Sequence, residues 1–369
     1  MSVVRGEARR RWLLVAALVA ALCSVPFAVA AFPVADARVD PPRLREMILG
    51  SSGRTYQGLV ETQGSLGLPD LPGLDDATAL LSGTSRMRAW YESPERWRVS
   101  HLTATGERDY IRSAQGTAIW DFEEAQLTRI MGAPAVRLPN AADLMPPDLA
   151  RRLLRLGNGS ELLSDLPARR VAGRTAAGLR VSPADTTTTI GSVDIWADPH
   201  TGVPLEVRIV PRGGSRAVLA SRFLDISDAR PSASAVAPQL ARGVRGTEVD
   251  TFDLLSRLAS RTMERMPDRL AGMPALETTP SIASLRAYSG GFSSFVVAPL
   301  PGRYGRRVFE AARTAGASAL TVARGEALAM QTSVLTAVLV RDGMIGRTFL
   351  LVGAVRPDLL RTAADELMS

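Results

Sequence analysis

The sequence predicts an α+β protein with one large antiparallel sheet and a smaller α+β domain after it. Short stretches of alternating polar and apolar residues follow one another from Tyr56 to Met131. A helical segment at Pro147–Leu156, entered by prolines and left at Gly157, separates them from a second group of strands. A stretch rich in Pro, Ser, Ala and Gly at Ala229–Gly246 is typical of a linker.

Each group of strands is bounded by turn residues. The first group is expected at Tyr56–Thr62, Arg86–Tyr91, Arg96–Ala104, Arg108–Ser113, Thr117–Phe122 and Gln126–Met131. The second group is expected at Val171, Leu179–Ser182, the hairpin Ser192–Ile209 and Ala217–Ile226. Because short turns join antiparallel neighbours, we expect one large sheet built from both groups, with the helix crossing between them.

One of the two histidines lies in the hairpin, in the sequence Asp198-Pro199-His200-Thr201-Gly202. An aspartate side chain caps such a turn, proline fixes its own φ, and glycine accepts a positive φ. No second or third member of a catalytic or metal site lies nearby in the sequence. We therefore interpret His200 as the exposed tip of a turn.

Composition excludes several classes of enzyme. The chain has 369 residues and a net charge of +7, and all 44 basic residues are arginine, which excludes lysine-dependent phosphate loops and Schiff bases. The single cysteine, Cys23, lies in the apolar N-terminal segment. No G-x-S-x-G motif is present. We predict a protein that is not an enzyme, without catalytic residues, metal or cofactor.

The N-terminus has the pattern of an export signal. Arginines at positions 5, 9, 10 and 11 precede an uncharged run from Trp12 to Phe32. The triplet Ala28-Val29-Ala30 favours a cleaved signal peptide, and a run of about 20 residues favours an uncleaved membrane anchor. Both alternatives place the rest of the chain outside the cytoplasm, on the extracytoplasmic face of the membrane or in the cell envelope.

Alternation divides the sheet into two unlike faces. Met87, Ala89 and Tyr91 share one face with Trp97 and Val99, and the arginines of the same strands share the other. The apolar face either packs on helices as an ordinary amphipathic sheet or encloses a ligand cavity. The segment from Gly67 to Leu74 places leucines between prolines and glycines, so Leu68 and Leu71 belong either to an insertion folded onto the core or to a mobile lip over an apolar opening.

Several short motifs occur in an order that resembles a known group. They are Tyr56-Gln57-Gly58, the Gly67–Gly73 loop, Trp97-Arg98-Val99, Ala118-Ile119-Trp120-Asp121, Val171-Ala172-Gly173-Arg174, Leu179–Pro183 and the Val193–Leu205 hairpin. In the order of these motifs the chain resembles the LolA-like lipoprotein carriers and the MucB/RseB-like proteins. Within that group it is most similar to the actinobacterial branch. The resemblance covers about Leu44 to Ile226.

The resemblance implies an open antiparallel half-barrel with covering helices that binds acyl chains outside the cytoplasmic membrane. Two functions are then open: a lipid or lipoprotein carrier or sensor, and a MucB/RseB-like envelope-stress regulator that binds a membrane-anchored anti-sigma factor through its C-terminal domain. The candidate ligand contacts, taken from strand faces and the loop, are Tyr56, Leu68, Leu71, Tyr91, Trp97, Val99 and Trp120.

The predicted partners follow from charge and export. A lipid or an acylated protein fits the apolar face, and an anionic membrane surface fits the positive charge. Nucleic acid is not expected, because the arginines are scattered among acids. The predicted domains are a signal peptide or anchor at 1–32, a LolA/RseB-like domain at 33–228, a linker at 229–246 and a small α+β domain at 247–369.

The C-terminal domain is expected to begin with a helix at Asp250–Met266, which Pro267 stops. Strands follow near Ser284–Tyr288, Ser293–Ala298, Leu335–Arg341 and Thr348–Val355, and a terminal helix starts at Pro357.

Overall fold

The computed structural model describes residues 12, 15, 37–67, 75–103, 106–131, 139–237, 245–250, 266–276, 285–343 and 346–369. The chain divides into two units, Met1–Asp36 and Ala37–Ser369, and both large sheets belong to the second unit. Nearly all of the predicted signal peptide or anchor, both lip leucines and the interior of the predicted Asp250–Met266 helix lie outside the described residues. Among the described residues, no helix is both long and apolar enough to cross a membrane.

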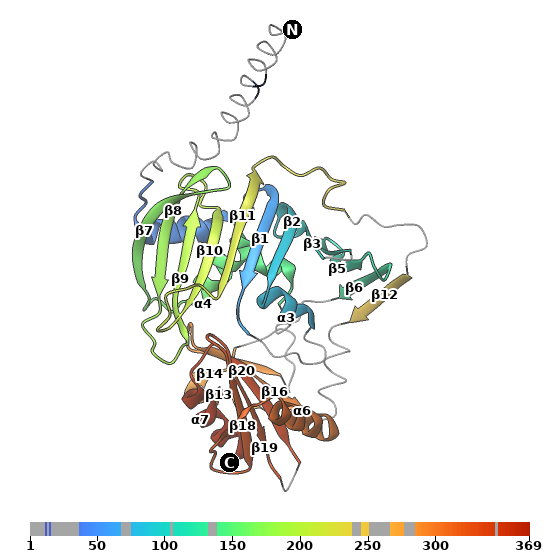
Figure 1. The fold of residues 1–369 in the computed structure, drawn as a ribbon, viewed down its shortest axis with the longest axis vertical. Helices are drawn as coiled ribbons and strands as arrows, with labels where there is room; N and C mark the ends of the chain where they lie inside the picture. The colour runs from blue at the N-terminus through green and yellow to red at the C-terminus, as the bar shows by residue number, and fades with distance from the viewer. Residues whose placement is uncertain are drawn as a thin grey trace, which may run out of the picture. The chain divides into compact units, whose positions relative to one another are not determined.

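One open sheet of 12 strands dominates the fold (Figure 1), in the order β12-β6-β5-β4-β3-β2-β1-β11-β10-β9-β8-β7. Its strands are β1 Tyr56–Gly64, β2 Thr84–Ser93, β3 Arg96–Leu102, β4 Glu107–Ser113, β5 Gly116–Asp121, β6 Gln126–Met131, β7 Leu162–Val171, β8 Arg174–Ser182, β9 Ile190–Ala197, β10 Pro204–Pro211, β11 Leu219–Ser227 and β12 Arg245–Asp250. Every pairing is antiparallel except that of β12 with β6. The predicted large antiparallel sheet is confirmed.

Two strands differ from the sequence prediction. The strand β7 runs over ten residues where only Val171 was expected, and Pro167 lies within its register shift between Leu166 and Arg169. The strand β12 extends the large sheet, whereas the predicted second domain starts at residue 247. Pro167 interrupts the alternation of β7, and β12 pairs with a strand far away in the sequence, so neither strand was visible in the sequence.

The predicted separation of the two faces is confirmed along β2, where Arg86 and Arg88 are exposed and Met87, Ala89 and Tyr91 are buried. The apolar face packs against five short helices: α2 Pro41–Gly50, η1 Ser51–Gly53, α3 Asp75–Leu81, η2 Ala141–Leu144 and α4 Pro146–Leu156. The helix α2 starts at two prolines after Asp40, whose side chain accepts a hydrogen bond from the backbone N–H of Arg43.

The hairpin between β9 and β10 turns as the sequence predicts. The Asp198 carboxylate accepts hydrogen bonds from the backbone N–H groups of His200, at 2.9 Å, and Thr201, at 3.0 Å. His200 is exposed, and Gly202 has a φ of +71°. A Cβ atom on Gly202 would lie 2.5 Å from the carbonyl oxygen of Met47 on α2, so the turn also fixes the helix against the sheet.

A second, six-stranded antiparallel sheet follows, in the order β15-β16-β20-β19-β18-β17. Its strands are β15 Arg286–Ser289, β16 Ser294–Leu300, β17 Ser318–Leu320, β18 Glu326–Gln331, β19 Thr336–Arg341 and β20 Thr348–Gly353. A small hairpin, β13 Arg269–Leu270 and β14 Met273–Pro274, precedes it. The helix α7 Pro357–Met368 packs in the core cluster of one face, and α6 Gly302–Thr314 in that of the other. The smaller α+β domain is thereby confirmed.

Hydrogen bonds join the loop between β8 and β9 to the second sheet. The buried Thr188 hydroxyl lies 3.2 Å from the carbonyl oxygen of Phe292 and 3.0 Å from that of Ala354. The backbone N–H of Arg356 donates to the carbonyl of Thr187, at 2.8 Å. Because the Thr188 hydroxyl is buried and paired, separating the loop from the second sheet would leave it without a partner.

Candidate functional site

The apolar face brings together four of the predicted ligand contacts. Tyr56, Tyr91 and Val99 are 2%, 4% and 4% exposed and belong to the main core, and Trp97 packs against it. The rings of Tyr56 and Tyr91 stack at 4.8 Å between centroids, and Phe223 meets Tyr56 edge-on at 5.6 Å. Burial raises the pKa of Tyr91 to about 12.

Polar contacts hold the helices over this face. The nearly buried Arg151 of α4 donates to the Ser51 hydroxyl at 3.2 Å and to the Asp148 carboxylate at 2.8 Å. The hydroxyl of Ser221 on β11 donates to the carbonyl of Leu144. Since the aromatic side chains are covered, an acyl chain reaches them only if the layer formed by α2, η2 and α4 moves.

The other three predicted contacts are not part of this group. Trp120 is 1% exposed and lies on the opposite face, in a small cluster with Ile111 and Leu127. Leu68 and Leu71 lie outside the described residues. The sequence predicted the strand that contains Trp120 but not the register in which this strand pairs. A register shift of one residue moves every side chain of a strand to the other face of the sheet.

A buried ion pair lies on the same side of the sheet as Trp120. Asp109 has no exposed surface, accepts a hydrogen bond from the Ser100 hydroxyl and lies 2.9 Å from the guanidinium of Arg98. Arg98 also lies 3.4 Å from Glu107 and stacks over Trp90 at 5.0 Å. Burial raises the pKa of Asp109 to about 6, against the opposing effects of Ser100 and Arg98.

We expect Asp109 to titrate near pH 6. Because its folded pKa lies above its unfolded value of 3.8, the folded chain holds the proton more tightly. The contribution of this group to stability therefore falls as pH rises from about 4 to about 6 and stays low above that range. Carboxyl-carbon NMR, assigned with Asp109→Asn, measures the midpoint. A midpoint at or below pH 4 would show that Arg98 outweighs burial.

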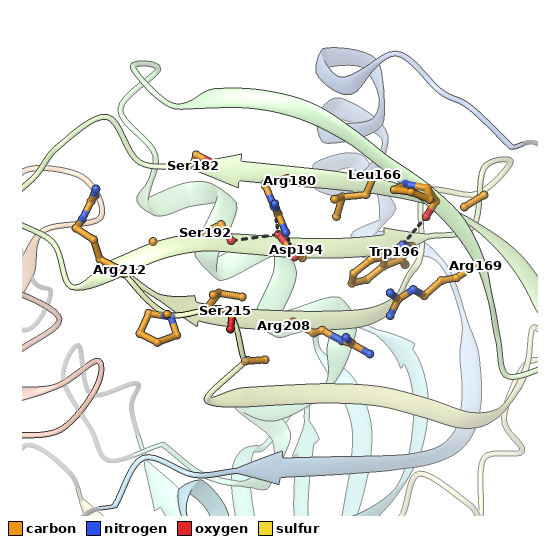
Figure 2. A pocket seen from close by; sticks show the side chains of 18 residues that line it. Leu166, Arg169, Arg180, Ser182, Ser192, Asp194, Trp196, Arg208, Arg212 and Ser215 are labelled. Atoms are coloured by element: carbon orange, nitrogen blue, oxygen red, sulfur yellow. Dashed lines mark hydrogen bonds and ion pairs between the residues drawn. The ribbon is translucent and has the colours of Figure 1, made fainter.

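An open pocket lies on the charged face of β8, β9 and β10 (Figure 2). Its cavity of about 830 Å³ is partly roofed by the irregular part of β7. The Trp196 ring forms one end, and its indole N–H donates to the carbonyl of Pro167 at 3.1 Å. Arg169 stacks on this ring at 3.6 Å, and Arg208 lies 5.4 Å from its centroid.

Carboxylates position the arginines of the pocket. Glu206 accepts from Arg169 at 3.2 Å and from Arg208 at 2.6 Å. The two carboxylate oxygens of Asp194 accept from Nε and Nη2 of Arg180, each at 2.7 Å. Alternation in the sequence already puts Asp194 and Trp196 on one strand face. The pocket itself was not predicted, because Arg169 reaches it only through the bend of β7.

The described residues contain no group of three or more His, Cys, Asp and Glu side chains that could hold a metal ion. No protein-family model matches the sequence, and no curated protein shows significant similarity to it. Solved structures do match. MucB of Pseudomonas aeruginosa in its complex with MucA aligns at 16% identity with a TM-score of 0.50, over 88% of this chain and 97% of that chain.

The chain has a LolA/RseB-like fold. A further crystal structure of MucB aligns at 15% identity and a TM-score of 0.45, over 89% of this chain and 97% of that chain. A LolA-superfamily protein of Nitrosomonas europaea aligns at 11% identity and a TM-score of 0.26, over 55% of this chain and all of its own. The predicted LolA/RseB-like fold is confirmed, and placement in the actinobacterial branch stays a prediction.

Proposed function

We propose that the chain is a non-enzymatic, extracytoplasmic regulator that binds a membrane-anchored partner of the anti-sigma type. The observation that carries the proposal is the fold similarity to MucB bound to the segment of MucA named MucA(peri), which spans 88% of this chain. That share is too large to come from the 12-stranded sheet alone, so it includes the second sheet. The N-terminal export pattern is consistent with this location.

The second sheet offers a docking surface of defined chemistry. On α6, Arg303, Tyr304, Arg306 and Arg307 are exposed, and Tyr304 is 55% exposed. An exposed tyrosine among arginines is a composition enriched at protein interfaces. The positive charge selects for an acidic segment of the partner. We place partner binding on this surface.

Affinity capture from the protein's own membranes tests this function. We expect a membrane protein with an extracytoplasmic acidic segment to be recovered, and the isolated segment to bind the purified chain. Arg303→Glu with Arg307→Glu should weaken that binding at least tenfold, because like charges then face each other. Arg86→Glu, on the other sheet, serves as the control. If both variants bind as the parent does, α6 is not the docking surface.

The aromatic cluster on the apolar face supports a second function, the binding of an acyl chain. Burial of each methylene contributes about 0.8 kcal/mol, so a long chain could displace the covering helices. If uptake of the acyl chain moves α2 and α4, the change in conformation can alter partner binding, which favours a sensor over a simple carrier. A fluorescent fatty acid tests this: a sensor takes it up and changes its affinity for the partner, whereas a carrier passes it to acceptor vesicles.

A further inference from the structure

The pocket beside Trp196 is shaped by the bend in β7. Arg169 on β7 bonds to Glu206 on β10, although β8 and β9 lie between these strands in the sheet. The edge strand therefore arches over the charged face and makes a hollow there (Figure 2). This face is opposite to the aromatic cluster under the helices, so the pocket is separate from the proposed acyl site.

Arginine dominates the hollow. Arg169, Arg180, Arg208 and Arg212 line it, and Asp194 is its one lining carboxylate in the part of the chain that the structure describes. Arg212 lies at the opposite end from Trp196, where its guanidinium donates to the carbonyl oxygens of Thr188 at 3.0 Å and Asp185 at 2.7 Å.

The carboxylates around the pocket do not use all the donors of these arginines. Glu206 takes a single nitrogen each from Arg169 and Arg208, and a guanidinium carries five N–H donors. Even when Asp185 is counted with Asp194 and Glu206, four guanidinium groups face three carboxylates. An excess of positive charge and of N–H donors therefore remains in a hollow of about 830 Å³.

We propose that this pocket binds a phosphate-bearing ligand. A phosphate group accepts hydrogen bonds through several oxygens pointing in different directions, which fits guanidinium groups that come from three strands. A lone carboxylate is planar and is satisfied by one arginine fork, as Asp194 is by Arg180. Both a soluble phosphate ester and the phosphate of a lipid headgroup provide this chemistry.

The variant Arg208→Gln tests the site with little risk to the fold, because Glu206 keeps Arg169 as a partner. Arg86→Gln is a matched control on the same face. This substitution likewise removes one of two arginines that pair with a glutamate, because Arg86 pairs with Glu61. Glu61 keeps its second partner, Arg222, at 3.0 Å. Arg86 does not line the pocket.

The measurements use the full chain with two probes at constant ionic strength. Pyrophosphate binding is followed by calorimetry, and binding to phosphatidylcholine vesicles with and without phosphatidic acid is followed by sedimentation. We expect Arg208→Gln to weaken binding about tenfold, the usual value of a hydrogen bond between charged groups. Arg86→Gln should change it less than twofold.

The two probes separate the sources of the phosphate. Pyrophosphate binding alone indicates a soluble phosphate ester, and binding of phosphatidic acid vesicles alone indicates a lipid headgroup. The proposal is overturned if neither probe binds, or if Arg86→Gln weakens binding as much as Arg208→Gln, which would indicate general attraction to a chain of charge +7. Partner capture is measured without phosphate, so either proposal can fail while the other stands.

Discussion

Gly202→Ala is expected to lower the free energy of unfolding by about 3 kcal/mol, through backbone strain and overpacking together. Gly202 has a φ of +71°, and an added Cβ would lie 2.5 Å from the carbonyl oxygen of Met47 and 2.6 Å from its carbonyl carbon. Both are backbone atoms of α2, so neither can move without shifting the helix.

The control for this change is Gly213→Ala. Gly213 has a φ of +77° and no atom within 4 Å of an added Cβ, so the substitution reports backbone strain alone, about 1 kcal/mol. Urea denaturation of both variants and of the parent measures how much each substitution lowers the free energy of unfolding. Equal losses of unfolding free energy in the two variants would mean that the β9–β10 turn does not pack closely against α2.

Tyr56→Ala is expected to destabilise the large-sheet region by about 3–5 kcal/mol, as for other large-to-small changes in a packed core. The side chain is 2% exposed and contacts the rings of Tyr91 and Phe223. Tyr304→Ala, at a residue that is 55% exposed, serves as the control and should change the stability by less than about 0.5 kcal/mol.

This comparison also bears on the acyl-binding hypothesis. A tyrosine that packs in a dry core loses its full burial energy on truncation, whereas a side chain lining a water-filled cavity loses little. A loss below about 1 kcal/mol for Tyr56→Ala would indicate that the apolar face is open in solution. The full loss would mean that ligand uptake has to open the helical layer.

Much of the sheet could be predicted from sequence because its faces differ so strongly. Met87, Ala89 and Tyr91 alternate with arginines, and the turn at Asp198–Gly202 carries its own signals, so the strand and turn positions followed directly. The edge strand β7 was missed because Pro167 interrupts it, and the parallel strand β12 because pairing across 119 residues, as between Arg245 and Gln126, leaves no local pattern.

The candidate sites show the same limit. Tyr56, Tyr91, Trp97 and Val99 came together because they share strand faces, which sequence reveals. Trp120 lies on the other face because the face of each side chain depends on strand register, which the sequence alone does not define. The arginine pocket depends on the bend in β7 that carries Arg169 to Glu206, and no periodicity in the sequence encodes that bend.

Native mass spectrometry of the chain, purified with its captured membrane partner, tests the regulatory function most directly. We expect a complex of the chain with the extracytoplasmic segment of the membrane partner. Addition of an amphiphile should release this segment, and the mass of the chain should then increase by the mass of the bound amphiphile. A chain that carries lipid, passes it to acceptor vesicles and never binds a membrane partner would contradict a regulatory function and identify a carrier.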